Sequence, residues 1–391
     1  MIYNLGAVEA AIIAGMAFIP YFLILFFKNK TICDELLVSA KYEYLDSLRG
    51  IAATFVLIHH SRMIYNFHSI GVFTDKGVFS YSSSMIEKIF GYMGSGSVMI
   101  FFMITGFLFF DKLLKDGGFE DARSFYIKRV NRLLPAILGS LVFAIVISLF
   151  FGVNCLNNNA FGAVISWLSF GFIRLIPITN SLPDGLMVAG VFWTLAIEWK
   201  FYFIIPFLSI FTKELKFALI SVLIMASLVI LCIKFNLLTE RDATILACFI
   251  LGFIAAVLNR LLSVNVLMLV GGWLFATLAV ALVMYVTYAY PESYNVRIAL
   301  SLFFILFSVV NNNSFLGVLS FKPLVLAGKA SYSIYITHGI VLNFVCGYLL
   351  KGSPYYATFI VAAFLVSVIS VLFYFKIERP FMIRPVGIKK K

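Results

Sequence analysis

Long apolar stretches follow one another along this chain, and the polar connections between them are short. A helix of about 20 apolar residues crosses the hydrocarbon core of a bilayer, and several stretches reach that length. Hydrophobic residues make up 62% of the chain and charged residues only 12%, whereas soluble domains contain about 25% charged residues. Backbone polar groups inside lipid must bond within the protein, which helices achieve locally. The sequence therefore predicts an all-α fold, a polytopic transmembrane helix bundle in a lipid bilayer.

The pattern predicts about eleven membrane spans, with the amino terminus outside and the carboxyl terminus in the cytoplasm. Basic residues concentrate at 111–133 and after Lys376, and cytoplasmic connections carry such an excess. This distribution explains the formal net charge of +12 without nucleic-acid binding. Segment 161–177 is expected to lie in the interface or to re-enter, because counting it as a span would place the basic tail outside. The predicted spans are 5–27, 46–66, 96–113, 134–152, 196–212, 217–234, 242–260, 266–289, 296–312, 330–351 and 356–376.

Arg49 and His60 form the first candidate pair for chemistry. Ten residues separate them, so both side chains lie on one face of a helix, about 16 Å apart. Ionisable side chains at membrane depth are costly and are functional candidates by default. A neutral imidazole can take a proton from a hydroxyl group, so His60 is predicted as a general base. Asp46 is expected to pair with Arg49.

A less specific interpretation of this pair stays open. Arg49 could reach the lipid headgroups with its long side chain, and His60 could simply bond a neighbouring helix.

Glu198 is the centre of a second candidate cluster, near the outer end of an apolar helix. Its carboxylate could orient His60 or bind a sugar hydroxyl group. Trp193 could stack on a sugar ring, and Tyr202 lies one helical turn beyond Glu198. An interfacial belt of aromatic residues is the alternative.

A basic segment contributes Lys128, Arg129 and Arg132. Arginine side chains match phosphate oxygens well, so we predict that these residues and Arg49 bind the phosphates of an acyl-CoA. Positive-inside topology alone is the alternative explanation.

Ser331, Tyr335 and His338 share one face of a predicted helix. We expect them to support the site through hydrogen bonds between helices.

No HExxH, GxSxG or paired Cys/His spacing occurs. The sequence therefore predicts no metal site and gives no support to metalloprotease or serine-hydrolase chemistry.

Six blocks of the sequence, taken in order, resemble the membrane-bound acyltransferase-3 family. Each block alone is weak, but six in sequence are specific, and the resemblance covers about residues 42–382. The blocks are Tyr44–Gly50 with His60 ("LDxLRG…H"), Phe101–Phe107 ("FFxxSGF"), the segment ending Arg132–Pro135 ("RRxxRxxP"), Trp193–Tyr202 ("WSLxxExxFY"), Ser331–His338 ("SYSxYLxH") and Ile377–Pro380 ("IExP").

The resemblance implies ten core helices within residues 41–382. Residues 1–40 would then add a transmembrane helix and a cytoplasmic linker, and residues 383–391 a basic cytoplasmic tail. It also implies transfer of an acyl group, usually acetyl from acetyl-CoA, to a hydroxyl group of a carbohydrate. The carbohydrate would be a surface polysaccharide such as a lipopolysaccharide O-antigen, or its polyprenyl-linked precursor, at a bacterial inner membrane.

The same resemblance assigns roles to individual residues. His60 matches the family's catalytic histidine and Arg49 its essential partner. The acyl-CoA would be a co-substrate, with no cofactor bound permanently. His60 would deprotonate the acceptor hydroxyl group or carry the acyl group itself. No fused hydrolase-like domain is recognised, so the membrane domain is expected to complete transfer alone or with a separate partner.

Two other function classes stay open. A transporter or flippase of a lipid-linked glycan would also use buried charges, although transporters typically show internal repeats. A non-catalytic membrane scaffold gives no reason for a buried Arg and His.

Overall fold

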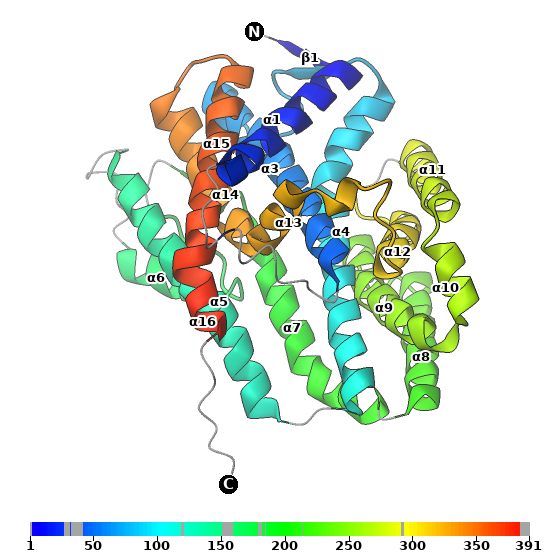
Figure 1. The fold of residues 1–391 in the computed structure, drawn as a ribbon. Helices are drawn as coiled ribbons and strands as arrows, with labels where there is room; N and C mark the ends of the chain where they lie inside the picture. The colour runs from blue at the N-terminus through cyan, green and yellow to red at the C-terminus, as the bar shows by residue number, and fades with distance from the viewer. Residues whose placement is uncertain are drawn as a thin grey trace.

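The computed structural model describes residues 2–26, 32, 42–118, 121–150, 159–178, 182–183, 185–212, 214–290 and 293–383. These residues form helices joined by short connections, and one small sheet (Figure 1). The α-helices are α1 (Ala7–Phe26), α3 (Glu43–Ile70), α4 (Ser84–Asp116), α5 (Ala122–Phe150), α6 (Ala160–Leu168), α7 (Trp193–Leu208), α8 (Leu215–Lys234), α9 (Glu240–Leu261), α10 (Val264–Val270), α11 (Trp273–Ala289), α12 (Val296–Val310), α13 (Lys322–Lys329), α14 (Ser331–Phe344), α15 (Tyr355–Phe373) and α16 (Arg379–Ile383). Short 3-10 turns form η2 (Leu186–Val188), η3 (Ser209–Thr212) and η4 (Val318–Ser320), and π-helical turns form η5 (Val345–Leu349) and η6 (Tyr374–Glu378). The strands β1 (Tyr3–Leu5) and β2 (Phe79–Tyr81) pair in parallel.

The predicted all-α, polytopic membrane bundle is confirmed. Seven of the described helices are long and apolar enough to cross a bilayer, or eight if the bent pair α10 and α11 is one span. Large apolar side chains stay exposed along α8 and α11, among them Leu223, Ile230, Leu274 and Leu278. Extended apolar surfaces of this kind suit contact with lipid.

The number of spans stays a prediction. Each of the eleven predicted spans coincides with a described helix or with the bent pair. However, α7 has 16 residues and α12 has 15, and α3 carries polar side chains such as Asp46 and Arg62. Helix α6 has 9 residues, which measure about 14 Å and are too short to cross a bilayer. This length agrees with the expectation that segment 161–177 does not span.

Helices α4 and α5 are longer than predicted, so the connection expected at 111–133 is almost entirely helical. Gly117 ends α4 with a φ of 69°. The Asp121 carboxylate accepts two hydrogen bonds of 3.0 Å from backbone N–H groups in the first turn of α5, which caps that helix. The small residues 94–97, which the hydropathy pattern places at a helix start, lie in the middle of α4.

The helices that carry the candidate residues pack at the centre of the bundle. Helix α3 packs along α4, α13 and α14, and α4 packs along α9. At the α4–α9 crossing, a Cβ on Gly252 would lie 2.3 Å from the Met103 carbonyl oxygen, so the crossing requires glycine. The two strands lie at one end of the bundle, at the top of Figure 1, and α5 begins at the other end. Helix α4 connects the two ends.

Candidate active site

His60 on α3 is paired with His338 on α14. His60 Nδ1 lies 3.0 Å from His338 Nε2, and the two rings stack with centroids 5.2 Å apart and planes 15° apart. His338 Nδ1 in turn lies 3.0 Å from the carbonyl oxygen of Ile334. The sequence indicated His338 only as a supporting residue, whereas the structure makes it the direct partner of His60.

These contacts assign a tautomer to each neutral imidazole. A carbonyl oxygen can only accept a hydrogen bond, so Nδ1 of His338 carries a proton and its Nε2 accepts. His60 Nδ1 must then donate to His338, which leaves the lone pair of His60 on Nε2. Among the described residues, no group hydrogen-bonds this nitrogen. His338 thus fixes the tautomer of His60 and leaves its Nε2 able to accept a proton, as an aspartate does for the histidine of serine hydrolases.

His59 and His60 line a cavity of about 190 Å³, named here the histidine chamber. His59 Nδ1 lies 3.3 Å from the Phe90 carbonyl oxygen. Gly94 on α4 leaves room for the His59 ring, which a Cβ would approach to 2.6 Å. No group of three or more His, Cys, Asp or Glu side chains in the described part of the chain could hold a metal ion. The chamber is lined by Val56, His59, His60, Gly91, Gly94, Ser95, Val98, Ala189, Gly190, Val191, Trp193, Ser293, Tyr294 and Tyr335.

Trp193, predicted to stack on a sugar ring, lies in the wall of the histidine chamber. The guanidinium carbon of Arg241 lies 3.9 Å from the centroid of its ring. Because that cation covers one face of the indole, at most the other face is left for a ligand.

Arg49 lines a second cavity, of about 310 Å³, named here the basic cavity. Asp46 Oδ1 lies 3.6 Å from Arg49 Nη1, so the predicted ion pair is present. The cavity combines four cations with aromatic and aliphatic side chains. Its lining residues are Arg49, Val98, Phe101, Phe102, Ile104, Thr105, Leu108, Phe109, Lys112, Arg129, Arg132, Leu133, Thr194, Leu195, Glu198, Tyr202, Ser331, Tyr332 and Tyr335.

The residues predicted to bind phosphate separate into two groups. Arg129 and Arg132 line the basic cavity from one face of α5. Lys128 is exposed and lies outside this lining, because each residue advances the helix by about 100°. Lys112, which the sequence pattern placed in a cytoplasmic connection, lines the cavity instead because α4 continues past it.

Glu198 and Tyr202 lie on α7 in the basic cavity, not in the histidine chamber. The Tyr202 hydroxyl group donates a hydrogen bond to Oε1 of Glu198. The structure therefore differs from the expectation that Glu198 orients His60, since His338 already bonds the Nδ1 atom of His60. A carboxylate here instead offsets part of the charge of the surrounding arginines.

The other two predicted supporting residues on α14 have separate surroundings. The Tyr335 hydroxyl group lies 2.7 Å from that of Thr194, which links α14 to α7. Ser331 lines the basic cavity, and its buried hydroxyl group has no hydrogen-bond partner within the described ranges. The expected cluster between helices therefore includes Tyr335 and His338 but leaves Ser331 free.

The two cavities adjoin each other along α4. Val98 and Tyr335 belong to the lining of both, so the chamber and the basic cavity meet at these residues. Arg49 and His60, which their spacing places on one face of a helix, thus line two adjoining cavities. The arrangement brings an open imidazole nitrogen next to a cavity rich in cations.

Comparison with known proteins gives matches over most of the chain. The model of the acyltransferase 3 family, described as an acyltransferase domain, matches residues 42–375. O-acetyltransferase OatA of Staphylococcus aureus is 24% identical over an alignment of 330 residues that covers 76% of this chain and 53% of that protein. Peptidoglycan O-acetyltransferase OatA of Listeria monocytogenes is 32% identical over an alignment of 137 residues that covers 32% of this chain and 21% of that protein. The chain thus spans about half the length of its Staphylococcus relative, and no solved structure gives a significant match.

Proposed function

Because the chain belongs to the acyltransferase 3 family, whose model covers residues 42–375, we propose that it is a membrane O-acyltransferase. It moves an acyl group, acetyl in this proposal, from acyl-CoA to a hydroxyl group of a cell-surface polysaccharide or its lipid-linked precursor. The observation that carries the proposal is the His60–His338 pair beside the basic cavity. The relatives' names, O-acetyltransferase and peptidoglycan O-acetyltransferase, support acetyl as the group and a glycan as the acceptor.

The basic cavity has the chemistry that acyl-CoA requires. Arg129 and Arg132 offer planar donors that fit phosphate oxygens, and the largely apolar remainder of the wall suits the uncharged pantetheine arm. The thioester then lies where the cavity meets the histidine chamber, at Val98 and Tyr335.

Transfer needs one base, which is the Nε2 atom of His60. This nitrogen takes the proton of the acceptor hydroxyl group while the oxygen of that hydroxyl group attacks the thioester carbonyl carbon. A C–O ester bond forms, the C–S bond breaks, and the proton passes from the imidazolium to the leaving thiolate. His338 keeps its hydrogen bond to Nδ1 throughout and stabilises the imidazolium. In the alternative sequence, Nε2 attacks the thioester first and carries the acyl group to the hydroxyl group.

Replacement of His60 by Ala in the protein's native cells tests the proposal. Acetate released by mild alkali from the surface glycans is measured, with the protein level checked in the membrane. General-base catalysis contributes about 10²–10⁴ in rate, so we expect at least about a 100-fold loss. His68→Ala is the matched control, because His68 lies on the same helix and bonds Asn343 Oδ1 at 3.0 Å outside the chamber. His338→Gln, which can still accept from Nδ1–H, is expected to retain more activity than His338→Ala.

A flippase for a lipid-linked glycan is the second candidate, favoured by cavities that adjoin along one helix. The same strains separate the two functions. Loss of the whole glycan from the surface in His60→Ala cells would support the flippase. Normal glycan export with unchanged acetate would overturn the catalytic assignment of His60.

A further inference from the structure

A third cavity continues from the histidine chamber, away from the basic cavity. It has a volume of about 350 Å³ and shares Gly91 and Ser293 with the chamber. We name it the polar vestibule, because almost every side chain in its wall is polar. Its other lining residues are Asp75, Ser84, Glu87, Lys88 and Tyr92.

Helix α4 lines the three cavities one after another. It contributes Ser84 to the vestibule, Gly91 to both vestibule and chamber, Val98 to both chamber and basic cavity, and Lys112 to the basic cavity. From Ser84 to Lys112 the helix measures about 42 Å at 1.5 Å per residue. A bilayer with its headgroups is about 40–45 Å thick. The vestibule therefore lies at the membrane face opposite to the cations of the basic cavity.

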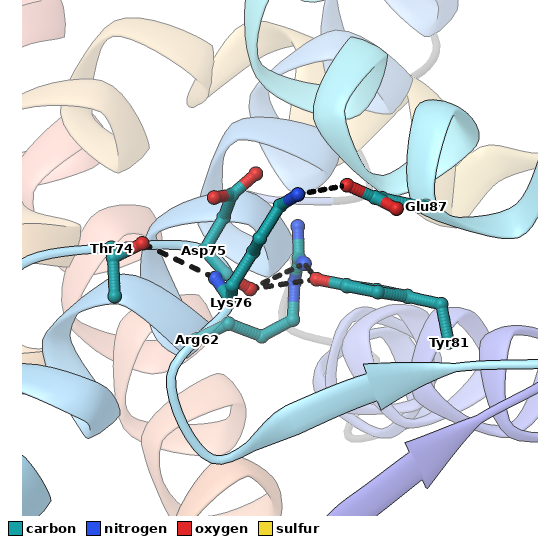
Figure 2. Close-up of polar contacts among 6 residues, drawn as sticks. All are labelled: Arg62, Thr74, Asp75, Lys76, Tyr81 and Glu87. Atoms are coloured by element: carbon teal, nitrogen blue, oxygen red, sulfur yellow. Dashed lines mark hydrogen bonds and ion pairs between the residues drawn. The ribbon is translucent and has the colours of Figure 1, made fainter. Parts of the chain in front are cut away.

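The wall of the vestibule is fixed from inside by Arg62, a fully buried residue of α3. Its guanidinium donates to the Asp75 backbone carbonyl oxygen at 3.4 Å and to the Tyr81 hydroxyl group, as Figure 2 shows. It also donates to the Phe90 carbonyl oxygen at 3.0 Å. Tyr81 donates to the same Asp75 carbonyl oxygen at 2.7 Å, and burial raises the pKa of Tyr81, which keeps its donor proton. The backbone at Asp75 is thereby held in place.

The side-chain carboxylate of Asp75 has no such partner. In Figure 2 it is turned away from Arg62, and no described residue hydrogen-bonds it. Glu87 differs, because Lys76 Nζ lies 2.7 Å from its carboxylate. The vestibule thus presents, on a fixed backbone, one carboxylate that no described side chain hydrogen-bonds. Such a group accepts hydrogen bonds from sugar hydroxyl groups.

We propose that the polar vestibule is the acceptor subsite, which binds a sugar unit through Asp75 and admits it past Gly91 to His60. This inference rests on the proposed acyltransferase function. The volume of about 350 Å³ lies in the range of sites for small molecules. A Cβ added to Gly91 would meet no atom within 4 Å, so the space beside this glycine is open where the vestibule joins the chamber.

Gly91→Leu tests the passage, because a Cβ there meets no atom within 4 Å and the longer side chain narrows the opening between the two cavities. Membrane vesicles from the native cells, which carry their own acceptor, receive radiolabelled acetyl-CoA, and the initial rate of label entering glycan is measured. We expect at least a tenfold lower rate. Gly15→Leu is the matched control, since a Cβ at Gly15 on α1 also meets no atom within 4 Å, and it should retain the wild-type rate.

Asp75→Asn tests the ligand group without removing the backbone carbonyl oxygen that Arg62 holds. The amide oxygen of Asn can still accept a hydrogen bond, but the loss of charge weakens that bond by an amount that corresponds to about a tenfold change. We therefore expect about a tenfold lower rate at limiting acceptor, with an unchanged KM for acetyl-CoA.

The outcomes separate this inference from the proposed function. Label that does not depend on His60 would refute the acyltransferase proposal itself. His60-dependent label at the wild-type rate in Gly91→Leu or in Asp75→Asn would overturn the vestibule assignment alone. Calorimetric titration of each purified variant with coenzyme A reports whether the fold is intact. If Gly91→Leu does not bind coenzyme A, the labelling rate of Asp75→Asn alone tests the vestibule assignment.

Discussion

Lys128 and Arg129 are neighbours in sequence but meet different surroundings. Arg129 lines the basic cavity, with its guanidinium carbon 5.1 Å from the centroid of the Phe109 ring, whereas Lys128 is exposed. Arg129→Ala should raise the KM for acetyl-CoA about tenfold or more, the effect of losing a hydrogen bond between charged groups. Lys128→Ala should leave this KM unchanged. The KM values are measured in membrane vesicles. If both variants raise the KM equally, general positive charge near the membrane surface attracts the donor, and the cavity does not bind it specifically.

The sequence predicts single residues well where one helix fixes their relative positions. Arg49, His60 and Asp46 lie on α3, so spacing alone places them. The pairing of His60 with His338 joins positions 278 residues apart and depends on how α14 packs against α3. The same limit applies to Glu198, because no local pattern says which of two adjoining cavities a face of α7 meets.

At the scale of elements, the crossing of α4 and α9 depends on the missing side chain of Gly252. A Cβ there would lie 2.3 Å from the Met103 carbonyl oxygen, so Gly252→Ala must push two central helices apart. Overpacking of this kind typically costs about 1–3 kcal/mol, and the midpoint of thermal unfolding in detergent should fall. Gly15→Ala is the control, because its Cβ would meet no atom within 4 Å. Equal midpoints would mean that the helices separate without cost.

The boundaries of elements were predicted less well than their existence. Hydropathy ends a helix where charged residues begin, yet α5 starts twelve residues before the predicted span at 134–152. Local chemistry marks the true boundaries, since Gly117 ends α4 and the Asp121 carboxylate caps α5. A search for capping residues would have found both.

At the scale of the whole molecule, we predict that Ser82 and Lys128 lie at opposite membrane faces, because the polar vestibule and the basic cavity lie at opposite ends of α4. Both positions are exposed. Introduced singly as cysteines, Ser82→Cys should react in intact cells with a membrane-impermeant maleimide, and Lys128→Cys only after the cells are opened. The protein without an introduced cysteine is the control for reaction of the native cysteines. The reverse pattern would contradict the predicted orientation and would place the donor site outside the cell.

Composition was sufficient to predict the bundle, because apolar stretches of this length have few alternatives in lipid. The cavities could not be predicted, since each is bounded by helices distant in sequence. The parallel pairing of β1 with β2 was missed for a related reason: each strand has three residues, too few for a recognisable alternating pattern.

This small sheet places a demand on biosynthesis. Tyr3 pairs with Phe79, which the ribosome adds about 4–15 s later at about 5–20 residues per second. Helices α1 and α3 are both translated in that interval, before the partner strand exists. Strand β1 therefore has no partner strand until Phe79 and its neighbours have been synthesised.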